Sequence, residues 1–242
     1  MTAIAVHHLT RRFGNRTAVD GLNLTICKGE LFALLGQNGA GKTTTIKMLC
    51  CLLRPTSGDA VLLGDSIVAI PAAVKQKLNV SPQETAVAPN LTVRENLVLM
   101  AQVYGADSRA ARARAEEMLQ AFGLAERAGD RARTLSGGMQ RRLSIAMALI
   151  SNPDILFLDE PTLGLDVRAR RDLWSVVRAL KGRITIILTT HYLEEAEALA
   201  DRIGIMHGGR LQALGTVAEL KAQTGTESLE EAFLALTGEG GS

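Results

Sequence analysis

Gly36-Gln37-Asn38-Gly39-Ala40-Gly41-Lys42-Thr43 is a glycine-rich segment that matches the pattern G-x-x-x-x-G-K-[ST]. It follows an apolar run, Leu31 to Leu35, and precedes an amphipathic stretch, Thr44 to Leu53. This order predicts a strand, a loop and a helix, which is the context in which the pattern indicates a phosphate-binding loop. The alternative, a glycine-rich turn with a chance lysine, fits this context poorly.

The loop predicts which atoms meet a nucleotide. Glycines let the backbone N–H groups turn toward an anion, and the positive end of the following helix dipole strengthens the attraction. Lys42 is expected on the β- and γ-phosphates, the Thr43 hydroxyl on Mg²⁺, and the Thr44 hydroxyl on a further phosphate oxygen. The predicted nucleotide-binding residues of this segment are Gly36, Asn38, Gly39, Ala40, Gly41, Lys42, Thr43 and Thr44.

Composition limits the class of protein. The 242 residues are 47% hydrophobic, which suffices for one large domain or for a core with an inserted lobe. No stretch approaches about 18 uninterrupted apolar residues, so the sequence predicts no membrane span, and its first residues show no signal-peptide pattern. The formal net charge of +2 argues against general affinity for nucleic acid. The three cysteines, an odd number, do not form a disulfide framework.

Strand-like and helix-like segments alternate along most of the chain. Such alternation predicts an α/β fold with a mostly parallel sheet whose strand C-terminal ends carry the ligand site. Strands are expected at 2–9, 22–26, 60–63, 66–70, 79–81, 155–158, 184–189, 202–207 and 210–214. Helices are expected at 44–53, 71–78, 91–104, 106–122, 136–150, 167–180, 192–201, 216–223 and 228–236.

Helix-period segments dominate between about residues 85 and 152. We therefore expect a single domain, 1–242, in which residues 1–84 and 153–242 form a P-loop NTPase core with an antiparallel β subdomain. Residues 85–152 are expected to form an inserted helical subdomain. Its arginine-rich segment at 106–122 predicts a solvated helix face, although docking onto a partner is the other interpretation.

A pair of acidic residues ends a buried strand. Ile155-Leu156-Phe157-Leu158 is apolar throughout, as in a strand covered on both faces, and Asp159-Glu160 follows it. Next to a phosphate-binding loop, Asp159 is expected to hold Mg²⁺ directly or through water. Because strand side chains alternate, Glu160 points elsewhere and is expected to face the γ-phosphate as general base on water. Without that loop, a solvated acidic pair would be the better interpretation.

Two further features have both a structural and a functional interpretation. Ser136-Gly137-Gly138 opens a helix with an N-cap serine and exposed N–H groups that can bind an anion. Since a capped helix start is common, the pattern alone favours a structural role. Phe13, an aromatic residue in a charged turn at 11–16, can stack on a base or fold back onto the core, and the sequence does not separate the two.

The order of these elements resembles the ATP-binding cassette (ABC) ATPases over nearly the whole chain. The resemblance rests on the phosphate-binding loop, Leu135-Ser136-Gly137-Gly138-Met139-Gln140, Asp159-Glu160-Pro161-Thr162 and a lone histidine after a strand. It implies the ABC ATPase fold, with residues 36–43 as Walker A and Asp159 and Glu160 as Walker B aspartate and catalytic glutamate. It also implies that the helical region is the signature subdomain.

The resemblance assigns the remaining site residues. Gln83 is implied to contact Mg²⁺ or the attacking water, and His191 to be the switch histidine on the γ-phosphate. Ser136, Gly137 and Gly138 are implied to bind the γ-phosphate held by the opposite subunit. Asp166 is the implied D-loop aspartate and Phe13 the implied adenine-stacking residue. The implied catalytic residues are thus Glu160, His191, Gln83 and Lys42, and the implied Mg²⁺ ligands are Thr43, Gln83 and Asp159.

The departures from the family pattern are small. A tyrosine is commoner at the position of Phe13, and a glutamine at the position of Met139. Leu163-Gly164 stands where Ser-Ala is frequent. None of these removes a group needed for hydrolysis, and stacking needs only the aromatic ring.

The resemblance implies a function. The chain is expected to be the ATPase subunit of a transporter, with ATP and Mg²⁺ as cofactors. It is expected to pair head to tail with a second copy of itself or a paralogous cassette, around two ATP molecules. A separate transmembrane permease is the expected partner, so that the chain is cytoplasmic and peripheral on the inner face of the cell membrane. No nucleic-acid partner is expected.

The branch of the family remains an analogy. Met139 to Ala146, Gly164-Leu165-Asp166 and the tail Leu229 to Leu234 resemble exporters of the drug- and antibiotic-efflux branch. Alternatives are a non-transport ABC ATPase of DNA repair or translation, and the ATPase subunit of an importer. A P-loop kinase acting on a small molecule explains neither the Ser136 motif nor His191.

Overall fold

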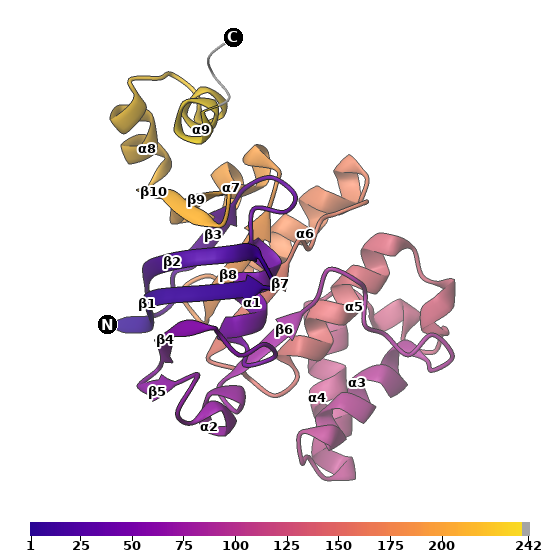
Figure 1. Ribbon diagram of the computed structural model, residues 1–242. Coiled ribbons are helices and arrows are strands. Elements are labelled where there is room, and N and C mark those ends of the chain that lie inside the picture. The colour runs from indigo at the N-terminus through magenta and orange to yellow at the C-terminus, as the bar shows by residue number, and fades with distance from the viewer. Residues whose placement is uncertain (239–242) are drawn as a thin grey trace.

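The computed structural model describes residues 1–238, in which two β-sheets are packed with helices (Figure 1). The larger sheet has the order β10-β9-β3-β8-β7-β6, and its neighbours pair in parallel apart from the β10–β9 pair. Its strands are β3 (Leu31–Leu35), β6 (Leu78–Ser81), β7 (Ile155–Asp159), β8 (Thr185–Thr190), β9 (Arg202–His207) and β10 (Arg210–Gly215). The predicted α/β class with a mostly parallel sheet is confirmed.

The smaller sheet is antiparallel and has the order β2-β1-β4-β5. Its strands are β1 (Thr2–Phe13), β2 (Arg16–Cys27), β4 (Ser57–Leu62) and β5 (Asp65–Ser66). The polar turn predicted at 11–16 is present but shorter, at residues 14–15, because Arg11 and Arg12 continue β1 and pair with Val19 and Thr17. Charged residues are tolerated there because one face of the hairpin is open to solvent.

The helices fall where the sequence predicts them, with shifts at their ends. They are α1 (Lys42–Leu49), α2 (Pro71–Lys75), α3 (Val93–Val103), α4 (Ser108–Ala121), α5 (Gly137–Leu149), α6 (Val167–Leu180), α7 (Leu193–Leu199), α8 (Val217–Thr224) and α9 (Leu229–Thr237). The helix predicted at 91–104 begins only at Val93, because Thr92 caps it in a capping box with Glu95. The strand predicted at 66–70 is wrong beyond Ser66, and short 3-10 turns at Ala125–Arg127 and Ala132–Thr134 were not predicted.

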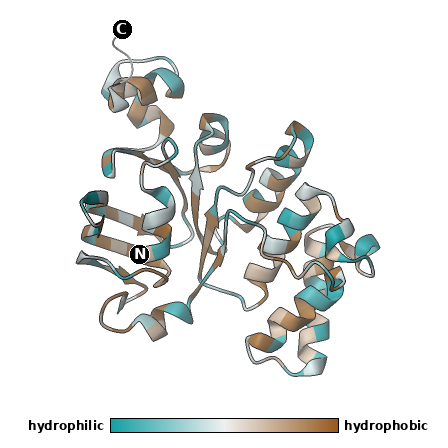
Figure 2. Cartoon of the chain, turned by 45° about the vertical axis from the view of Figure 1, so that its right-hand side comes forward, coloured by the Kyte–Doolittle hydropathy of each residue, from teal (hydrophilic) through white to brown (hydrophobic). Residues whose placement is uncertain are grey.

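Strand β7 illustrates how the core is built. Leu156 and Leu158 pack in one buried cluster with residues of α5 and α6, whereas Ile155 and Phe157 pack in another with α1 and the antiparallel sheet. Alternating side chains thus bury both faces, as the continuous apolar run predicts. Figure 2 shows hydrophobic residues along the strands and mixed faces on the helices.

Helices α3, α4 and α5 lie together on one side of the molecule, beyond the edge strand β6 (Figure 1). Within residues 1–238, no helix combines the length and the apolar character that a membrane span requires.

Candidate functional site

The phosphate-binding loop connects β3 to α1 at the C-terminal edge of the parallel sheet. Gly41 precedes α1 with φ of +105°, a backbone conformation that favours glycine. A Cβ at Gly36 would collide with the carbonyl oxygen of Met206, and a Cβ at Gly41 with that of Ala18. Both positions therefore require glycine in this packing, independently of any ligand.

Lys42 points back into the loop from the first turn of α1. Its Nζ donates to the carbonyl oxygens of Gly36 at 2.6 Å and Gln37 at 3.1 Å, and lies 3.3 Å from Glu160 Oε1. Only 4% of Lys42 is exposed. The loop thus fixes a buried cation beside the predicted general base, where a phosphate group can interact with it.

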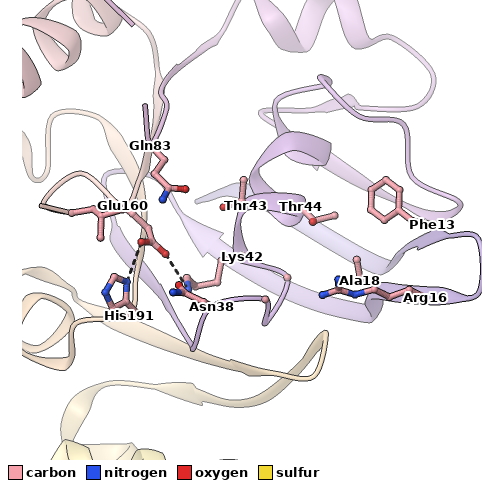
Figure 3. A pocket seen from close by; sticks show the side chains of 13 residues that line it. Phe13, Arg16, Ala18, Asn38, Lys42, Thr43, Thr44, Gln83, Glu160 and His191 are labelled. Carbon is pink, nitrogen blue, oxygen red and sulfur yellow. Dashed lines mark hydrogen bonds and ion pairs between the residues drawn. The ribbon is translucent and has the colours of Figure 1, made fainter. Parts of the chain in front are cut away.

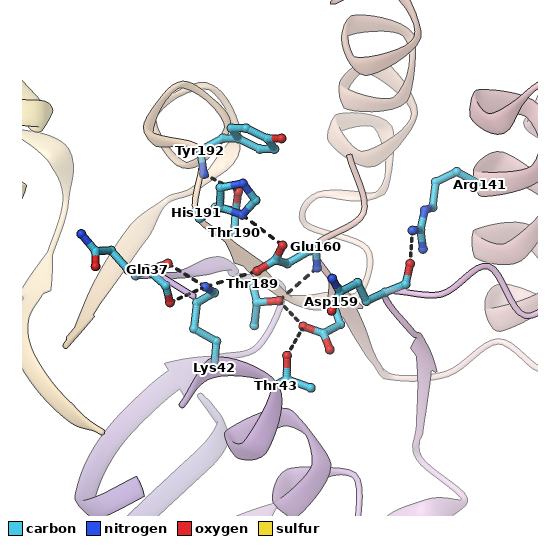
Figure 4. Close-up of polar contacts among 12 residues, drawn as sticks. Gln37, Lys42, Thr43, Arg141, Asp159, Glu160, Thr189, Thr190, His191 and Tyr192 are labelled. Carbon is cyan, nitrogen blue, oxygen red and sulfur yellow. Dashed lines mark hydrogen bonds and ion pairs between the residues drawn. The ribbon is translucent and has the colours of Figure 1, made fainter. Parts of the chain in front are cut away.

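Asp159 and Thr43 come together as predicted for a metal site. The Thr43 hydroxyl donates to Asp159 Oδ1 at 3.1 Å, and the Thr189 hydroxyl donates to the same oxygen at 2.5 Å (Figure 4). Within residues 1–238 there is no cluster of three or more His, Cys, Asp and Glu side chains that could hold a metal alone. One carboxylate and one hydroxyl fit Mg²⁺ bound mainly through nucleotide phosphates and water.

Glu160 lies between a cation and a histidine. Its Oε2 is 3.0 Å from His191 Nδ1, while its Oε1 faces Lys42 (Figure 4). Its backbone has φ of +46°, which is strained for a residue with a side chain. The Glu160 N–H donates to the carbonyl and the hydroxyl oxygen of Thr189, both at 3.1 Å. The neighbouring strand β8 therefore holds the Glu160 backbone in this conformation, while His191 and Lys42 contact its carboxylate.

These groups line one pocket of about 550 Å³ (Figure 3). Phe13 lies at one end and Glu160 with His191 at the other, with Lys42, Thr43 and Thr44 between them (Figure 3). The lining is Phe13, Arg16, Ala18, Asn38, Gly39, Gly41, Lys42, Thr43, Thr44, Gln83, Glu160, Leu163 and His191. Gly36, Ala40 and Asp159 do not line it, but the first two belong to the loop and Asp159 contacts Thr43.

The predicted signature residues Ser136, Gly137 and Gly138 and the D-loop aspartate Asp166 are not part of this pocket lining. Ser136 caps α5 by accepting a hydrogen bond from the Met139 N–H at 3.3 Å, and Asp166 caps α6 through the Ala169 N–H at 2.9 Å. The two helix starts touch, since a Cβ at Gly138 would lie 2.9 Å from Ala169 Cβ. Ser136, Gly137, Gly138 and Asp166 thus form a second surface, separate from the pocket.

Several residues around the pocket were not predicted. Arg16 and Ala18 line it, and Thr189 orients both acidic residues. Arg141, 4% exposed on α5, donates to the backbone carbonyls of Pro82 at 2.6 Å and of Gln83. Burial lowers the pKa of the Arg141 guanidinium, while the charges of Asp159 and Glu195 oppose that shift. The sequence carries no local signal for this contact, because about sixty residues separate its partners.

Phe13 does not fold back onto the core. It is 46% exposed and lines the pocket, which favours the stacking interpretation. The Arg11 guanidinium lies 4.5 Å from the centre of the Phe13 ring and donates to the Arg54 carbonyl at 2.8 Å. Arg11 therefore supports the ring by a cation–π contact and anchors it to the segment after α1.

Removing either part of this aromatic support should weaken nucleotide binding. If a nucleotide base stacks on Phe13, Phe13→Ala removes about 1–3 kcal/mol of stacking, whereas Arg11→Ala removes a cation–π contact of about 0.5–1 kcal/mol, or about two- to five-fold in affinity. We expect both variants to raise the KM for ATP with little change in kcat. Arg12→Ala is the matched control, because the Arg12 side chain is exposed. An unchanged KM in Phe13→Ala would exclude stacking.

Comparison with known proteins adds independent information. A family model described as ABC transporter matches residues 19–163, which is more than half of the chain. The daunorubicin resistance ATP-binding protein DrrA3 of Streptomyces coeruleorubidus is 45% identical over 230 residues, covering 95% of this chain and 73% of that protein.

Two solved structures are similar over most of the chain. The structure of an ATP-binding subunit of an ABC transporter has a TM-score of 0.86 and 31% identity, covering 97% of this chain and 99% of that one. A dimeric, post-hydrolysis ATP-binding cassette bound to ADP and Pi has a TM-score of 0.79 and 26% identity, covering 88% of this chain and 98% of that one.

Proposed function

Since this chain belongs to the ABC transporter family, we propose a specific role for each residue of its pocket that meets the nucleotide. The chain is an ATP-binding and ATP-hydrolysing subunit of the drug-resistance or exporter type, and it works as an ATP-driven dimer. Adenine stacks on Phe13, and the phosphates lie on the loop with Lys42 and Thr44. Glu160 takes the proton from the attacking water, and His191 contacts the γ-phosphate.

The placement of Glu160 carries this proposal. Its carboxylate lies 3.3 Å from Lys42 Nζ and 3.0 Å from His191 Nδ1, at the end of the pocket opposite Phe13. In that position the Glu160 carboxylate faces the terminal phosphate of a nucleotide whose adenine ring stacks on Phe13. Thr43, Asp159 and Gln83 would hold Mg²⁺, which neutralises phosphate charge when bound.

The second surface supports a head-to-tail pairing of two chains. The N-terminus of α5, with Ser136, Gly137 and Gly138, is an anion-binding geometry that lies outside the pocket of its own chain. In our proposal it binds the γ-phosphate of the partner, with Asp166 in the adjoining D-loop. The partner is a second copy or a paralogous cassette.

A permease completes the proposed transporter and places the chain at the inner face of the membrane. Leu99, Val103 and Tyr104 expose apolar side chains on α3 and at its end. The Tyr104 hydroxyl donates to Asn79 Oδ1 at 2.5 Å, and Asn79 belongs to β6, which leads to Gln83. A permease helix seated on the end of α3 would thus be connected with the pocket. Residues 85–152 are the proposed signature subdomain within the 1–242 domain.

The cargo is proposed from the relative alone. Daunorubicin resistance in that relative suggests export of drug-like or other small molecules. In such a transporter the substrate path lies in the permease, which therefore selects the cargo.

A charge introduced into the proposed docking surface for the permease, formed by Leu99, Val103 and Tyr104, should separate permease binding from ATP hydrolysis. Val103 is 68% exposed, so Val103→Asp leaves the fold intact but places a carboxylate in an apolar interface. We expect capture of a polytopic membrane protein from detergent-solubilised membranes, with Mg·ATP present, to fall at least about tenfold. ATPase activity of the free chain should be unchanged.

Arg112→Asp, on the exposed side of α4, is the matched control and should retain capture. Equal capture by Val103→Asp would refute the docking surface. An eluate with only soluble repair or ribosomal components would refute the transporter role and support a non-transport ABC ATPase.

A further inference from the structure

Glu195 is a buried carboxyl that the proposed mechanism does not use. It lies in the first turn of α7, is 0% exposed, and its Oε1 accepts a hydrogen bond from Trp174 Nε1 on α6 at 3.0 Å. The side chains of Thr190 and Thr162 also lie close to its carboxyl. Burial raises the pKa of Glu195, while its polar neighbours Thr190, Trp174 and Thr162 and the charge of Arg170 oppose that shift.

The partners of Glu195 belong to the segments that carry the proposed catalytic groups. Thr162 follows Glu160 by two residues and precedes the D-loop, and it is 1% exposed. Thr190, also 1% exposed, directly precedes His191. Trp174 lies on α6, the helix that the D-loop leads into. The Glu195 side chain therefore lies where the loop after Glu160, the segment before His191 and helix α6 meet.

The same cluster has unused hydrogen-bonding capacity. Glu195 Oε2, Thr162 Oγ1 and Arg170 Nε are buried and make no hydrogen bond of standard geometry. Buried polar atoms without a partner are costly, and a water molecule commonly bridges such groups.

A second contact between α6 and the histidine segment lies beside it. The Arg170 guanidinium is 4.9 Å from the centre of the Tyr192 ring, and that ring is 4.1 Å from the His191 ring. The Tyr192 N–H donates to the Thr190 hydroxyl at 2.9 Å (Figure 4). The segment 190–192 thus contacts α6 through the Tyr192 ring, beside the Glu195–Trp174 hydrogen bond.

We infer that Glu195 is a positioning residue for ATP hydrolysis. It is buried between the loop after Glu160 and the segment before His191, and its hydrogen bond to Trp174 fixes it there, so that its packing keeps the two groups in their mutual placement. This inference rests on the proposed roles of Glu160 and His191. Such a residue acts on the chemical step, because small displacements of reacting groups are costly there, and leaves nucleotide binding largely unchanged.

Two nearly isosteric variants test the inference. Glu195→Gln alters the carboxyl. Thr190→Val removes the neighbouring hydroxyl, which also accepts the Tyr192 N–H, at nearly unchanged side-chain volume. We expect kcat for ATP to fall about tenfold or more in each, with KM and ATP affinity within about twofold. Emission of Trp174, the only tryptophan of the chain, checks that the surrounding packing is kept.

Thr185→Val is the matched control. Thr185 is 2% exposed at the opposite end of the same strand, and its hydroxyl accepts a hydrogen bond from the Gly29 N–H at 3.1 Å. The inference is overturned if Thr190→Val and Glu195→Gln have the same kcat as the Thr185→Val control. It is also overturned if Thr190→Val and Glu195→Gln lose ATP affinity as much as they lose kcat. If Glu160→Gln itself hydrolyses ATP normally, the proposed function fails instead, which distinguishes the two.

Discussion

Glu160→Gln is expected to lower kcat for ATP hydrolysis by about 10²–10⁴-fold, equivalent to about 3–5 kcal/mol of barrier, while the chain still binds ATP. An amide of the same size cannot take a proton from water. The Glu160 backbone, with φ of +46°, keeps its N–H bonds to Thr189, because the substitution changes only the side-chain terminus. Fold stability should therefore be preserved.

The same substitution should trap the ATP-bound dimer. A carboxylate 3.3 Å from Lys42 repels an incoming γ-phosphate, and the neutral amide removes this repulsion. Since the γ-phosphate joins the two chains in the proposed mechanism, blocked hydrolysis keeps them together. Size-exclusion chromatography with Mg·ATP is expected to show a stable dimer for Glu160→Gln and a transient one for the wild type.

Asp154→Asn is the matched control for the loss of a carboxylate. Asp154 is exposed and directly precedes Ile155, the first residue of β7, whereas Glu160 follows the last residue of that strand; Asp154 does not line the pocket. The Asp154→Asn variant should hydrolyse ATP at the normal rate. Glu160→Gln turning over as fast as this control would rule out Glu160 as the general base.

Much of the site could be predicted because strand ends converge. Strands β3, β8 and β7 are parallel neighbours, so the residues after them meet at one edge of the sheet. Lys42, His191 and Glu160 follow these strands, and the apolar runs before them are visible in the sequence. Local patterns of this kind determine both the strand and the position of the side chain that follows it.

Contacts made across the fold could not be predicted in this way. Arg11 and Arg54 are far apart in sequence, and only the pairing of β1 with β4 brings them together. Glu195 stands in a charged sequence that suggests an exposed helix turn, yet it is fully buried. Tertiary packing sets its environment, and the periodicity of a short helix carries no information about Trp174 or Thr162.

Ser136→Arg is expected to abolish productive pairing while each chain still binds ATP. Ser136 is exposed at the start of α5 and lies outside the pocket, so an arginine there leaves the Lys42 site intact. Removing a positioned phosphate donor typically costs about 10²–10³-fold in kcat, and the larger side chain also blocks close approach of the partner. Combined with Glu160→Gln, it should prevent the ATP-dependent dimer in size-exclusion chromatography.

Loss of the helix cap is the competing explanation, and Ser136→Ala separates the two. Both substitutions remove the acceptor for the Met139 N–H, which costs about 1 kcal/mol of stability, but only arginine adds bulk. If the cap alone mattered, both variants would lose dimerisation equally. If α5 faces the partner, Ser136→Ala with Glu160→Gln still dimerises and the arginine variant does not. A Ser136→Arg, Glu160→Gln chain that dimerises with Mg·ATP would refute the head-to-tail arrangement, because the α5 start would then not face the phosphate of the partner.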